Sequence, residues 1–562
     1  MKKSLLLLAP CLLAGCATTY ADPDPAPMAM ADAESMPEIS VDTMREVTRV
    51  LSSDEFEGRY PGTPGEDKTL SYLVQQFQQV GLQPGGANGS WYQDVPLVEI
   101  NATDFSPLTI TGNGQSMSFA PGSDYVAVSY RATPETRIED SELVFVGYGI
   151  NAPERGWNDY EGIDMEGKTA VILVNDPDYE TEALEGTFNG RAMTYYGRWT
   201  YKYEEAARQG ATAALIVHDT FPAAYGWNVV ESSWTGPQSY AQSADDGMSQ
   251  TQANGWVQKS VAERIMKAAG KDLGTLSAAA KQKGFRPVPL GVTASMSFDN
   301  AIKRYASKNL LALLPGSERP DEYVLYTAHW DHLGRCKPDE TGDDICNGAI
   351  DNATGTAALV ALADAHRRAG APDRSLVFLA VTAEEQGLLG SKYYADNPVY
   401  PLAQTVGGVN MDALAMAGPA RDVTVVGGGK SELDAVLSTV LDDLGRVATP
   451  DPMPQNGYYY RSDHFSLAKL GVPMFYVDGG EDLVNGGREA GAARAARYTE
   501  NDYHAPSDEY DPNWDWSGAL ADLKVFYRLG RELAQSDEWP NWYDGDEFRA
   551  IRDQSCAGPG GC

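Results

Sequence analysis

Apolar and polar residues alternate in blocks along the second half of the chain. Between residues 309 and 533, short apolar runs bounded by turn residues are separated by helical stretches. The runs are 323–328, 375–381, 405–410 and 472–477. The stretch 354–368 is rich in alanine and is closed by Gly370, as a helix often is. Apolar strands that alternate with helices predict an α/β domain, a mostly parallel mixed sheet with helices on both faces.

A smaller pattern of the same kind lies upstream. Apolar runs at 143–146, 169–174 and 213–217 surround a helical stretch at 203–208, which Gly210 closes. Strand, helix and strand in this order predict a small α/β or β-rich module inserted into the main domain. Its short motifs resemble those of the protease-associated domain. They are Gly147-Tyr148-Gly149, Asp159-Tyr160, Gly167-Lys168 and Gly210-Ala211.

The first residues have the pattern of an export signal. Lys2 and Lys3 precede an apolar run at 4–13, which ends in Leu13-Ala14-Gly15-Cys16. A run this short, closed by small residues, is typical of a secretory signal and not of a transmembrane helix. The last four residues resemble the bacterial lipobox, in which the signal is cut before the cysteine and the thiol is lipidated. By resemblance to the lipoprotein sorting rule of bacteria with two membranes, Ala17 after Cys16, in place of an aspartate, favours the outer membrane over retention in the inner membrane. The alternative to lipidation is plain secretion.

Length and charge restrict the organisation and the partners. A chain of 562 residues is too long for one core, so more than one domain is expected. The plan is a signal at 1–15, a flexible tether at 16–40, the main domain at 41–140 and 297–540, the insert at 141–296, and a C-terminal tail at 541–562. The net charge of −35 argues against nucleic acid as a partner and predicts a solvated, repulsive surface. No pattern indicates an oligomeric state.

Export also determines how the remaining cysteines are interpreted. Outside the signal the chain has Cys336, Cys346, Cys556 and Cys562. Four thiols in an oxidising compartment predict two disulfides. Local pairing, Cys336 with Cys346 and Cys556 with Cys562, is the simplest of three connectivities. A zinc site made of thiolates is the alternative, but the spacings lack a paired C-x-x-C.

Candidate metal ligands follow the predicted strands. His329 comes directly after one strand, Glu384-Glu385 after the next, and Asp412 after a third, while Asp351 opens the alanine-rich helix. Because ligands gather at the carboxyl ends of strands in open α/β sheets, we expect these groups to converge on one edge. Imidazoles, several carboxylates and one carboxylate to spare are what a site for two divalent cations and a general base requires.

These residues fall into a series of motifs that resembles the co-catalytic zinc aminopeptidase family, metallopeptidase family 28. The resemblance covers roughly residues 309–533. The motifs are His329-x-Asp331, Asp351-Asn352-x-x-Gly355, Glu384-Glu385-x-Gly387-x-x-Gly390-Ser391, Asn410-x-Asp412 and a late His504.

The resemblance implies two zinc ions with Asp351 between them. One would be held by His329, Asp351 and Asp412, and the other by Asp351, Glu385 and His504. Glu384 would be the general base and later the acid for the leaving amine. Asp331 would orient His329, because a metal-bound histidine usually donates its other ring N–H to a partner that fixes the ring. A cis peptide bond at Asp351-Asn352 is also implied.

Two assignments depend on choices among neighbours. His504 competes with His464 for the last ligand position, and segments similar to Ser462-Asp463-His464 line the substrate pocket in relatives, which favours that function for His464. A tyrosine such as Tyr460 would donate a hydrogen bond to the developing oxyanion, unless the three tyrosines at 458–460 simply pack. His332 is expected to pack or form a hydrogen bond near the site.

The expected activity is therefore hydrolysis of peptides from the amino end by a zinc-dependent exopeptidase. A carboxypeptidase or dipeptidase of the same clan would share the zinc site and differ in the pocket. A glutaminyl cyclase on a similar fold would use one zinc ion. A binding module without activity should have lost ligands, and this chain retains each of them. The expected partners are peptides and, through lipidated Cys16, a membrane.

Overall fold

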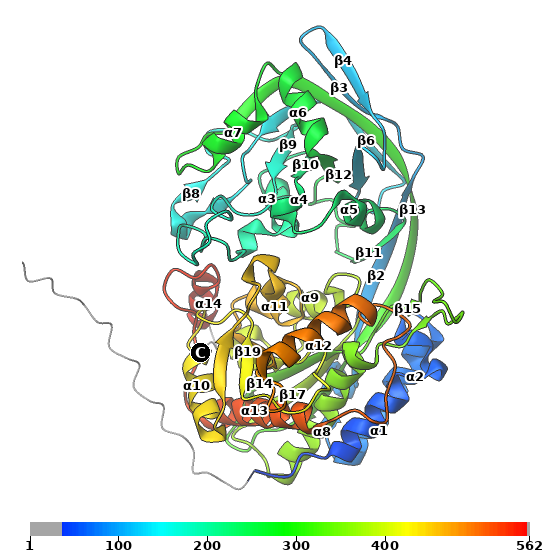
Figure 1. Cartoon of the computed structure of the whole chain (residues 1–562), viewed down its shortest axis with the longest axis vertical. Helices are drawn as coiled ribbons and strands as arrows, with labels where there is room; N and C mark the ends of the chain where they lie inside the picture. The colour runs from blue at the N-terminus through cyan, green and yellow to red at the C-terminus, as the bar shows by residue number, and fades with distance from the viewer. Residues whose placement is uncertain (1–35, 559–561) are drawn as a thin grey trace, which may run out of the picture.

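A computed structural model describes residues 36–558 and 562 (Figure 1). The chain forms an upper domain, residues 104–287, and a lower domain, residues 36–91 and 315–558, as oriented in Figure 1. Two long strands join them: β2 (Tyr92–Thr103) and β13 (Val288–Leu314). Cys16 and the predicted signal lie outside the described residues. In the described part of the chain, none of the helices is long and apolar enough to cross a membrane.

The lower domain contains a mixed sheet whose centre is parallel. Its order is β13, β17 (Arg374–Val381), β14 (Arg319–His329), β18 (Thr405–Asn410), β21 (Met474–Gly479), β19 (Asp422–Val425) and β20 (Val447–Pro450). The four strands from β17 to β21 are mutually parallel, and β13 and β19 run antiparallel beside them. The predicted strands are confirmed. The last begins two residues late because Pro473 has no N–H to donate to a ladder.

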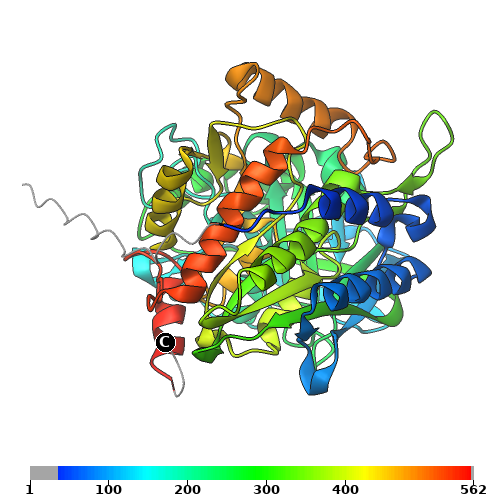
Figure 2. The same ribbon diagram turned by 90° about the horizontal axis from the view of Figure 1, so that it is seen from below.

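Helices cover both faces of this sheet. Side chains alternate along β14, so that Val324 and Tyr326 pack on one face and Tyr323 and Leu325 on the other. The first face, seen from below in Figure 2, carries α1 (Val41–Leu51), α2 (Pro64–Val80), α8 (Gly355–Arg368), α10 (Leu433–Leu444) and α13 (Ser517–Gln535). The second carries α9 (Leu389–Asp396) and α11 (His464–Ala468). The predicted α/β architecture is confirmed.

The upper domain has its own sheet and core. From β13 the order is β6 (Glu135–Phe145), β9 (Thr169–Leu173), β10 (Ala213–His218), β12 (Ala253–Gln258) and β5 (Tyr125–Val128). The hairpin β3 (Leu108–Gly112) and β4 (Gln115–Phe119) pairs with β13 as well. Leu108, Phe119 and Tyr125 are buried in this core. The boundary predicted at residue 141 therefore lies inside the upper domain and not at its edge.

The C-terminal segment is part of the lower domain. Trp542, Phe548 and Arg552 are buried, and α14 (Arg549–Cys556) follows. The Trp542 indole donates a hydrogen bond to the Gly471 carbonyl at 2.8 Å, and the Arg552 guanidinium donates to the Thr405 carbonyl at 3.0 Å. These contacts do not fit the tail predicted at 541–562.

Both predicted disulfides are present. Cys336 is bonded to Cys346, and Cys556 to Cys562. The local pairing is therefore confirmed, and the alternative of a zinc site made of thiolates is excluded for these four residues.

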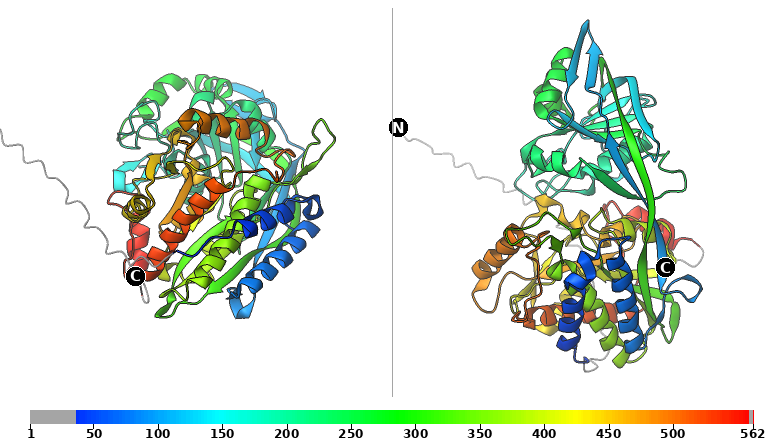
Figure 3. Two further views of the ribbon diagram at one scale, coloured as in Figure 1. Left: turned by 60° about the horizontal axis from the view of Figure 1, so that its bottom comes forward. Right: turned by 90° about the vertical axis from the view of Figure 1, so that its right-hand side faces the viewer.

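Continuous strand pairing holds the two domains together. β2 and β13 pair antiparallel from Tyr92 opposite Leu310 to Thr103 opposite Asp299, and the side view in Figure 3 shows this ribbon running through both domains. A second contact between the domains is an ion pair, in which the ammonium of Lys469 in the lower domain lies 2.6 Å from the Glu204 carboxylate of the upper domain.

Candidate metal centre

The ends of three strands and the start of one helix place the predicted ligands together. His329 is the last residue of β14, and Asp412 lies two residues beyond the end of β18. Glu384 and Glu385 follow β17, and Asp351 lies in the turn that leads into α8. The parallel strands all end at the same edge, so the sequence pattern that predicts the strands also brings these groups together.

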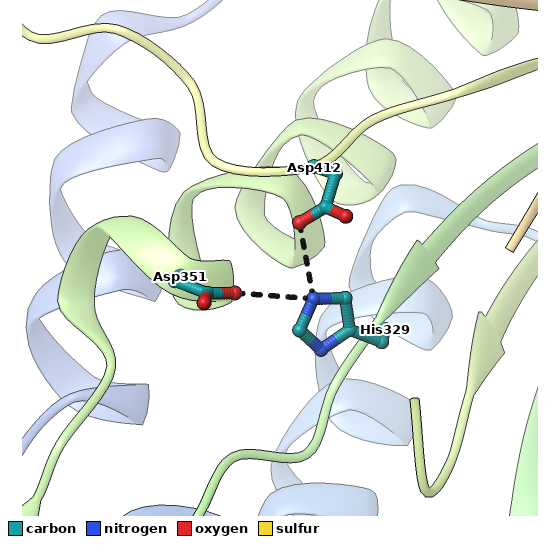
Figure 4. Close-up of side chains that lie close together, drawn as sticks. All are labelled: His329, Asp351 and Asp412. Carbon is teal, nitrogen blue, oxygen red and sulfur yellow. Dashed lines mark hydrogen bonds and ion pairs between the residues drawn. The ribbon is translucent and has the colours of Figure 1, made fainter. Parts of the chain in front are cut away.

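One group of donor atoms surrounds the His329 ring. Its Nε2 lies 3.1 Å from Asp412 Oδ1 and 3.2 Å from Asp351 Oδ1 (Figure 4). His329 and Asp351 are almost completely buried, so their orientation is fixed by the packing around them.

A second group shares Asp351 with the first. The His504 Nε2 lies 3.3 Å from Asp351 Oδ2 and 3.1 Å from Glu385 Oε2. The two oxygens of Asp351 therefore face two different histidines, which is the arrangement expected of a carboxylate that bridges two cations. The structure places His504, and not His464, in this position.

The spacing and charge of the donors fit a small divalent cation. Nitrogen and oxygen ligands bound tetrahedrally at zinc distances lie about 3.3 Å from one another, and the four contacts measure 3.1–3.3 Å. Burial alone would lower the pKa of His329, yet the carboxylates of Asp412 and Glu384 raise it well above its ordinary value. The cluster thus attracts positive charge, which a metal ion would supply.

Glu384 lies beside both groups with its carboxylate uncommitted. One of its oxygens belongs to a cluster with donors of His329 and Glu385 that lie within 4.8 Å of one another. Burial, followed by the negative charges of Asp412 and Glu385, raises the pKa of Glu384 well above its ordinary value, although His329 opposes the shift. A buried carboxylate with a raised pKa is suited to accepting and returning a proton.

Asp331 supports the centre differently from the prediction. Its main-chain carbonyl, at 3.1 Å, accepts the hydrogen bond from His329 Nδ1, whereas its carboxylate oxygen is 3.9 Å away. The carboxylate instead accepts a hydrogen bond from the Glu384 N–H at 3.2 Å. Burial raises the pKa of Asp331 to about 8. This residue therefore orients the His329 ring through its backbone and positions Glu384 through its side chain.

Residues 309–527 match the family model for peptidase family M28. This segment begins in β13, ends in α13 and contains every residue of the two donor groups. The segment is a peptidase family M28 domain.

Curated relatives match parts of the chain. Aminopeptidase NAALADL1 of Mus musculus is 30% identical over 138 residues, 23% of this chain and 17% of its own. A probable zinc metalloprotease of Pyrenophora tritici-repentis is 36% identical over 125 residues, 22% of this chain and 25% of its own. The leupeptin-inactivating enzyme 1 of Streptomyces exfoliatus is 28% identical over 186 residues, 32% of this chain and 38% of its own. The matched segment thus spans about a sixth to two fifths of these relatives.

Solved structures also resemble the chain. The aminopeptidase from Aneurinibacillus sp. strain AM-1 has a TM-score of 0.46 and 19% identity, covering 89% of this chain and 96% of that one. The zinc aminopeptidase of Bacillus subtilis has a TM-score of 0.39 and 15% identity, covering 91% of this chain and all of that one.

Of two predicted substrate residues of the M28 domain, Tyr460 lines the cleft that contains Glu384, and His464 is packed behind another cleft residue, Tyr476. The ring of His464 is buried and stacks on Tyr476, with 4.6 Å between ring centroids. The Tyr460 hydroxyl donates to the Glu547 carboxylate at 3.3 Å, and its ring packs 6.2 Å from Tyr195 of the upper domain. His464 thus packs against Tyr476, while Tyr460 both lines the cleft and contributes to the contact between the domains.

Tyr503 is an aromatic residue that the sequence does not single out. Its ring stacks on His504 at 3.8 Å between centroids, and it lines the same cleft as Glu384. The sequence signal that could have identified Tyr503 is its position directly before the last predicted ligand, His504. His332, which was expected to form a hydrogen bond near the site, lies with Nδ1 2.6 Å from Glu385 Oε1.

Side-chain amides and carboxylates hold the Asp351 turn. Asp508 accepts hydrogen bonds from the Ile350 N–H at 2.9 Å and the Asp351 N–H at 3.1 Å. The Asn352 amide donates to the Met411 carbonyl at 3.0 Å, which ties this turn to the segment of the next ligand. The Asp351–Asn352 peptide bond is cis, as predicted.

A fully buried arginine lies beneath the centre. The Arg59 guanidinium donates to the carbonyls of Leu51 at 2.7 Å, Trp330 at 2.9 Å, Asn347 at 2.6 Å and Gly348 at 2.9 Å. It therefore links the end of α1, the residue after His329 and the loop before Asp351. Nothing in the local sequence around Arg59 indicates this function, because its partners are up to 289 positions away.

The centre opens into a cleft of about 2180 Å³ between the two domains. Glu384, Glu385 and His504 of the lower domain line it together with Trp199 and Tyr240 of the upper domain. A space of this size admits a peptide and not merely a single amino acid.

Proposed function

We propose that the protein is a di-zinc metallopeptidase that removes residues from the amino end of peptides. The observation that carries the proposal is that two histidine–carboxylate groups share Asp351 and lie beside uncommitted Glu384 in a cleft. The names of M28 relatives, which include aminopeptidases and zinc metalloproteases, support the same reaction class.

The residues divide the work between holding metal and moving a proton. His329, Asp351 and Asp412 would hold one zinc ion, and Asp351, Glu385 and His504 the other. Bound zinc supplies Lewis acidity and lowers the pKa of water at the centre. Glu384 accepts the proton of the attacking water and returns it to the leaving amine as the peptide bond breaks. The Asp331 carboxylate keeps Glu384 in place by accepting a hydrogen bond from the Glu384 backbone N–H.

The charges in the cleft favour the amino end of a substrate. Asp478 lines the cleft, and burial together with the charge of Asp412 raises its pKa to about 7. Glu384 and Asp412 line the same cleft. This acidic end would attract the ammonium group of a peptide and repel its carboxylate. A carboxypeptidase would need a cation free to bind a carboxylate at this end, whereas Arg494, the cation beside Asp478, also has the charges of Asp522 and Glu481 near it. A glutaminyl cyclase with one zinc ion would leave half of the donor set without a function.

One substitution and a panel of substrates test the mechanism. We expect Glu384→Ala to lower kcat at least 10³-fold while zinc content, measured by mass spectrometry, stays at two per chain. Substrates would be amino-acid arylamides, peptides with free and acetylated amino ends, and an amino-terminal glutaminyl peptide. Full activity of metal-loaded Glu384→Ala would refute the general base. Equal cleavage of acetylated peptides would refute the preference for the amino end, and cyclisation of the glutaminyl peptide would indicate the transferase.

We further propose that the protein is exported and anchored by lipid at Cys16. The support is the pattern of Lys2, Lys3, the apolar run and the lipobox-like Leu13-Ala14-Gly15-Cys16. Expressed in a bacterium with two membranes, the full chain should partition into detergent and fractionate with the outer membrane. Cys16→Ala should lose this behaviour, and Cys11→Ala should retain it. Detergent partitioning of Cys16→Ala would overturn the proposal.

A further inference from the structure

Two arginines from different domains lie in the wall of the cleft. Arg198 is at the start of α3 (Trp199–Arg208) in the upper domain, and Arg461 follows Tyr460 in the lower domain. Both line the cleft that contains the metal centre. Arg461 is adjacent to Ser462, whose hydroxyl donates to Asp412 Oδ2 at 2.8 Å. The arginines are therefore beside the path that a substrate must take.

Neither guanidinium has an anionic partner within the described residues. The chain contains 79 acidic residues against 44 lysines and arginines, so an unpaired arginine is unexpected. Arg198 Nε is buried and makes no hydrogen bond. Three other cations of the cleft wall are paired with carboxylates within 2.7 Å: Arg208 with Glu205, Lys392 with Asp396, and Lys469 with Glu204. Arg494, which also lines the cleft, makes no such contact in the described part of the chain but has the charges of Asp522, Glu481 and Asp478 near it.

The two guanidiniums are also close enough to repel. Burial, and then the charge of Arg461, lowers the pKa of Arg198 to about 10. Burial raises the pKa of Tyr225, and the charges of Arg198 and Arg461 both oppose this rise. The Tyr225 hydroxyl is therefore near both guanidiniums. Two like charges held together at the edge of a cleft are stabilised when an anion lies between them.

Packing between the domains fixes this pair. The Met193 N–H donates to the Pro454 carbonyl at 3.1 Å across the domain boundary. A β-carbon on Gly457 would lie 2.8 Å from Met193 Sδ and 3.5 Å from Arg198 Cδ, so a side chain there would displace Met193, which packs beside the arginine. The Arg461 guanidinium lies 5.5 Å from the centroid of the Tyr458 ring, which restricts its orientation.

We propose that Arg198 and Arg461 form a carboxylate subsite that binds an anionic group of the peptide substrate. A guanidinium presents parallel N–H groups that match the two oxygens of a carboxylate. The carboxylate would be the C-terminal group of a short peptide or an acidic side chain in a longer one. This inference rests on the proposed peptidase function and adds a substrate class to it: the acidic end of the cleft takes the ammonium, and the arginine pair takes the carboxylate.

The test compares peptides that differ by this one charge. Full-length, zinc-loaded protein would be assayed with peptides of two to five residues that begin with Leu-Ala. Each peptide would be used as the free acid and as the C-terminal amide. Amidated peptides with one glutamate at successive positions form a second series. The variants are Arg198→Gln, Arg461→Gln and Arg198→Lys. The control is Arg137→Gln, an exposed arginine of β6 that pairs with Glu135.

For the wild type, we expect kcat/KM to be about 10–100-fold higher for the free acid than for the amide at one peptide length, mainly through KM. Each glutamine variant should lose this ratio and cleave amides at the wild-type rate, which also shows that it is folded. Arg198→Lys should retain part of the ratio, and Arg137→Gln all of it. If the free acid has no advantage, but a glutamate raises kcat/KM within the amidated series and the glutamine variants remove this gain, the subsite binds an acidic side chain.

Failure of this subsite is distinguishable from failure of the proposed function. Normal cleavage of amides with a free-acid ratio that neither glutamine variant changes would overturn the subsite and leave the peptidase function standing. If no peptide is cleaved, the peptidase proposal fails. A measurement of peptide binding then tests whether the arginine pair binds a carboxylate. Calorimetric titration of Leu-Ala-Ala into Glu384→Ala and into Glu384→Ala/Arg198→Gln should show at least tenfold weaker binding to the double variant. Equal binding would refute the subsite.

Discussion

Replacing Arg59 by methionine removes a side chain that joins three separate segments under the metal centre. Methionine fills most of the same volume, so the main change is the loss of the guanidinium. The carbonyls of Leu51, Trp330, Asn347 and Gly348 would each lose a donor in a place where water has no access. Two consequences are expected: lower stability of the lower domain, and weaker metal binding.

The magnitude follows from opposing contributions. Hydrogen bonds to a charged donor contribute about 1.5–3 kcal/mol each, so four contribute about 6–12 kcal/mol in total. Burial lowers the pKa of Arg59 to about 10, and keeping the charge inside therefore costs about 3 kcal/mol, which the variant regains. Bonds to one guanidinium are not additive. We therefore expect the low end of the difference, a loss of about 3–5 kcal/mol.

Urea unfolding of the metal-free protein, followed by tryptophan fluorescence, measures this loss. The control is Arg49→Met, which removes an exposed arginine on α1 that pairs with Glu46 at 2.8 Å. The control should shift the free energy of unfolding by less than about 0.5 kcal/mol. Zinc affinity should fall for Arg59→Met alone, because Trp330 and Gly348 flank the ligand segments. An Arg59→Met protein within 1 kcal/mol of the wild type, at an unchanged slope, would refute the reasoning.

Three further predictions concern other parts of the molecule. His332→Ala removes the ring 2.6 Å from Glu385 and should weaken zinc binding about 10–100-fold, measured by competition with a chelating dye; unchanged affinity would contradict this. Burial raises the pKa of Asp434 to about 6, so its ionisation destabilises the fold as pH rises from about 4 to 6. Asp434→Asn should therefore be about 1–2 kcal/mol more stable than the wild type at pH 7, after allowance for partial exposure, and equal to it near pH 4; an equal urea midpoint at both pH values would contradict this. Cys336→Ser/Cys346→Ser opens a loop with a sequence separation of 10 and should lose about 2–3 kcal/mol by the same assay, whereas an unshifted midpoint would count against it.

Local sequence patterns were sufficient for the strands and for most of the centre. β18 coincides with the predicted run 405–410 because a strand buried on both faces is a continuous apolar segment bounded by turns. His329, Glu385 and Asp412 follow such runs directly, so predicting the strands also predicts where their side chains meet. His504 follows no strand, and its placement depended on the resemblance of its segment to a family motif.

Contacts between distant segments could not be read from the sequence in the same way. The Arg59 partners are dispersed carbonyl groups, which every residue possesses and no pattern marks. His464 was expected in the cleft, but its position under Tyr476 depends on how α11 rotates against the sheet. The segment 541–562 has the composition of a tail, yet Trp542 and Arg552 are buried and form hydrogen bonds with the lower domain. The boundary at residue 141 missed β3 to β5, because their pairing partners β13 and β12 lie far along the chain, opposite Thr111 at Thr293 and opposite Val128 at Asn254.

The ribbon of β2 and β13 also has a consequence for the order of folding. β2 ends at residue 103 and β13 begins at residue 288, so the upper domain is one uninterrupted piece of chain, whereas the lower domain is built from both sides of it. During synthesis, α1 and α2 leave the ribosome long before their partner α8 exists. The upper domain can close as soon as β13 appears, and its closure brings residues 92 and 310 together. The folded upper domain thus shortens the chain loop between the two segments of the lower domain. It also brings the strands that precede the metal centre into their final pairing before the centre assembles.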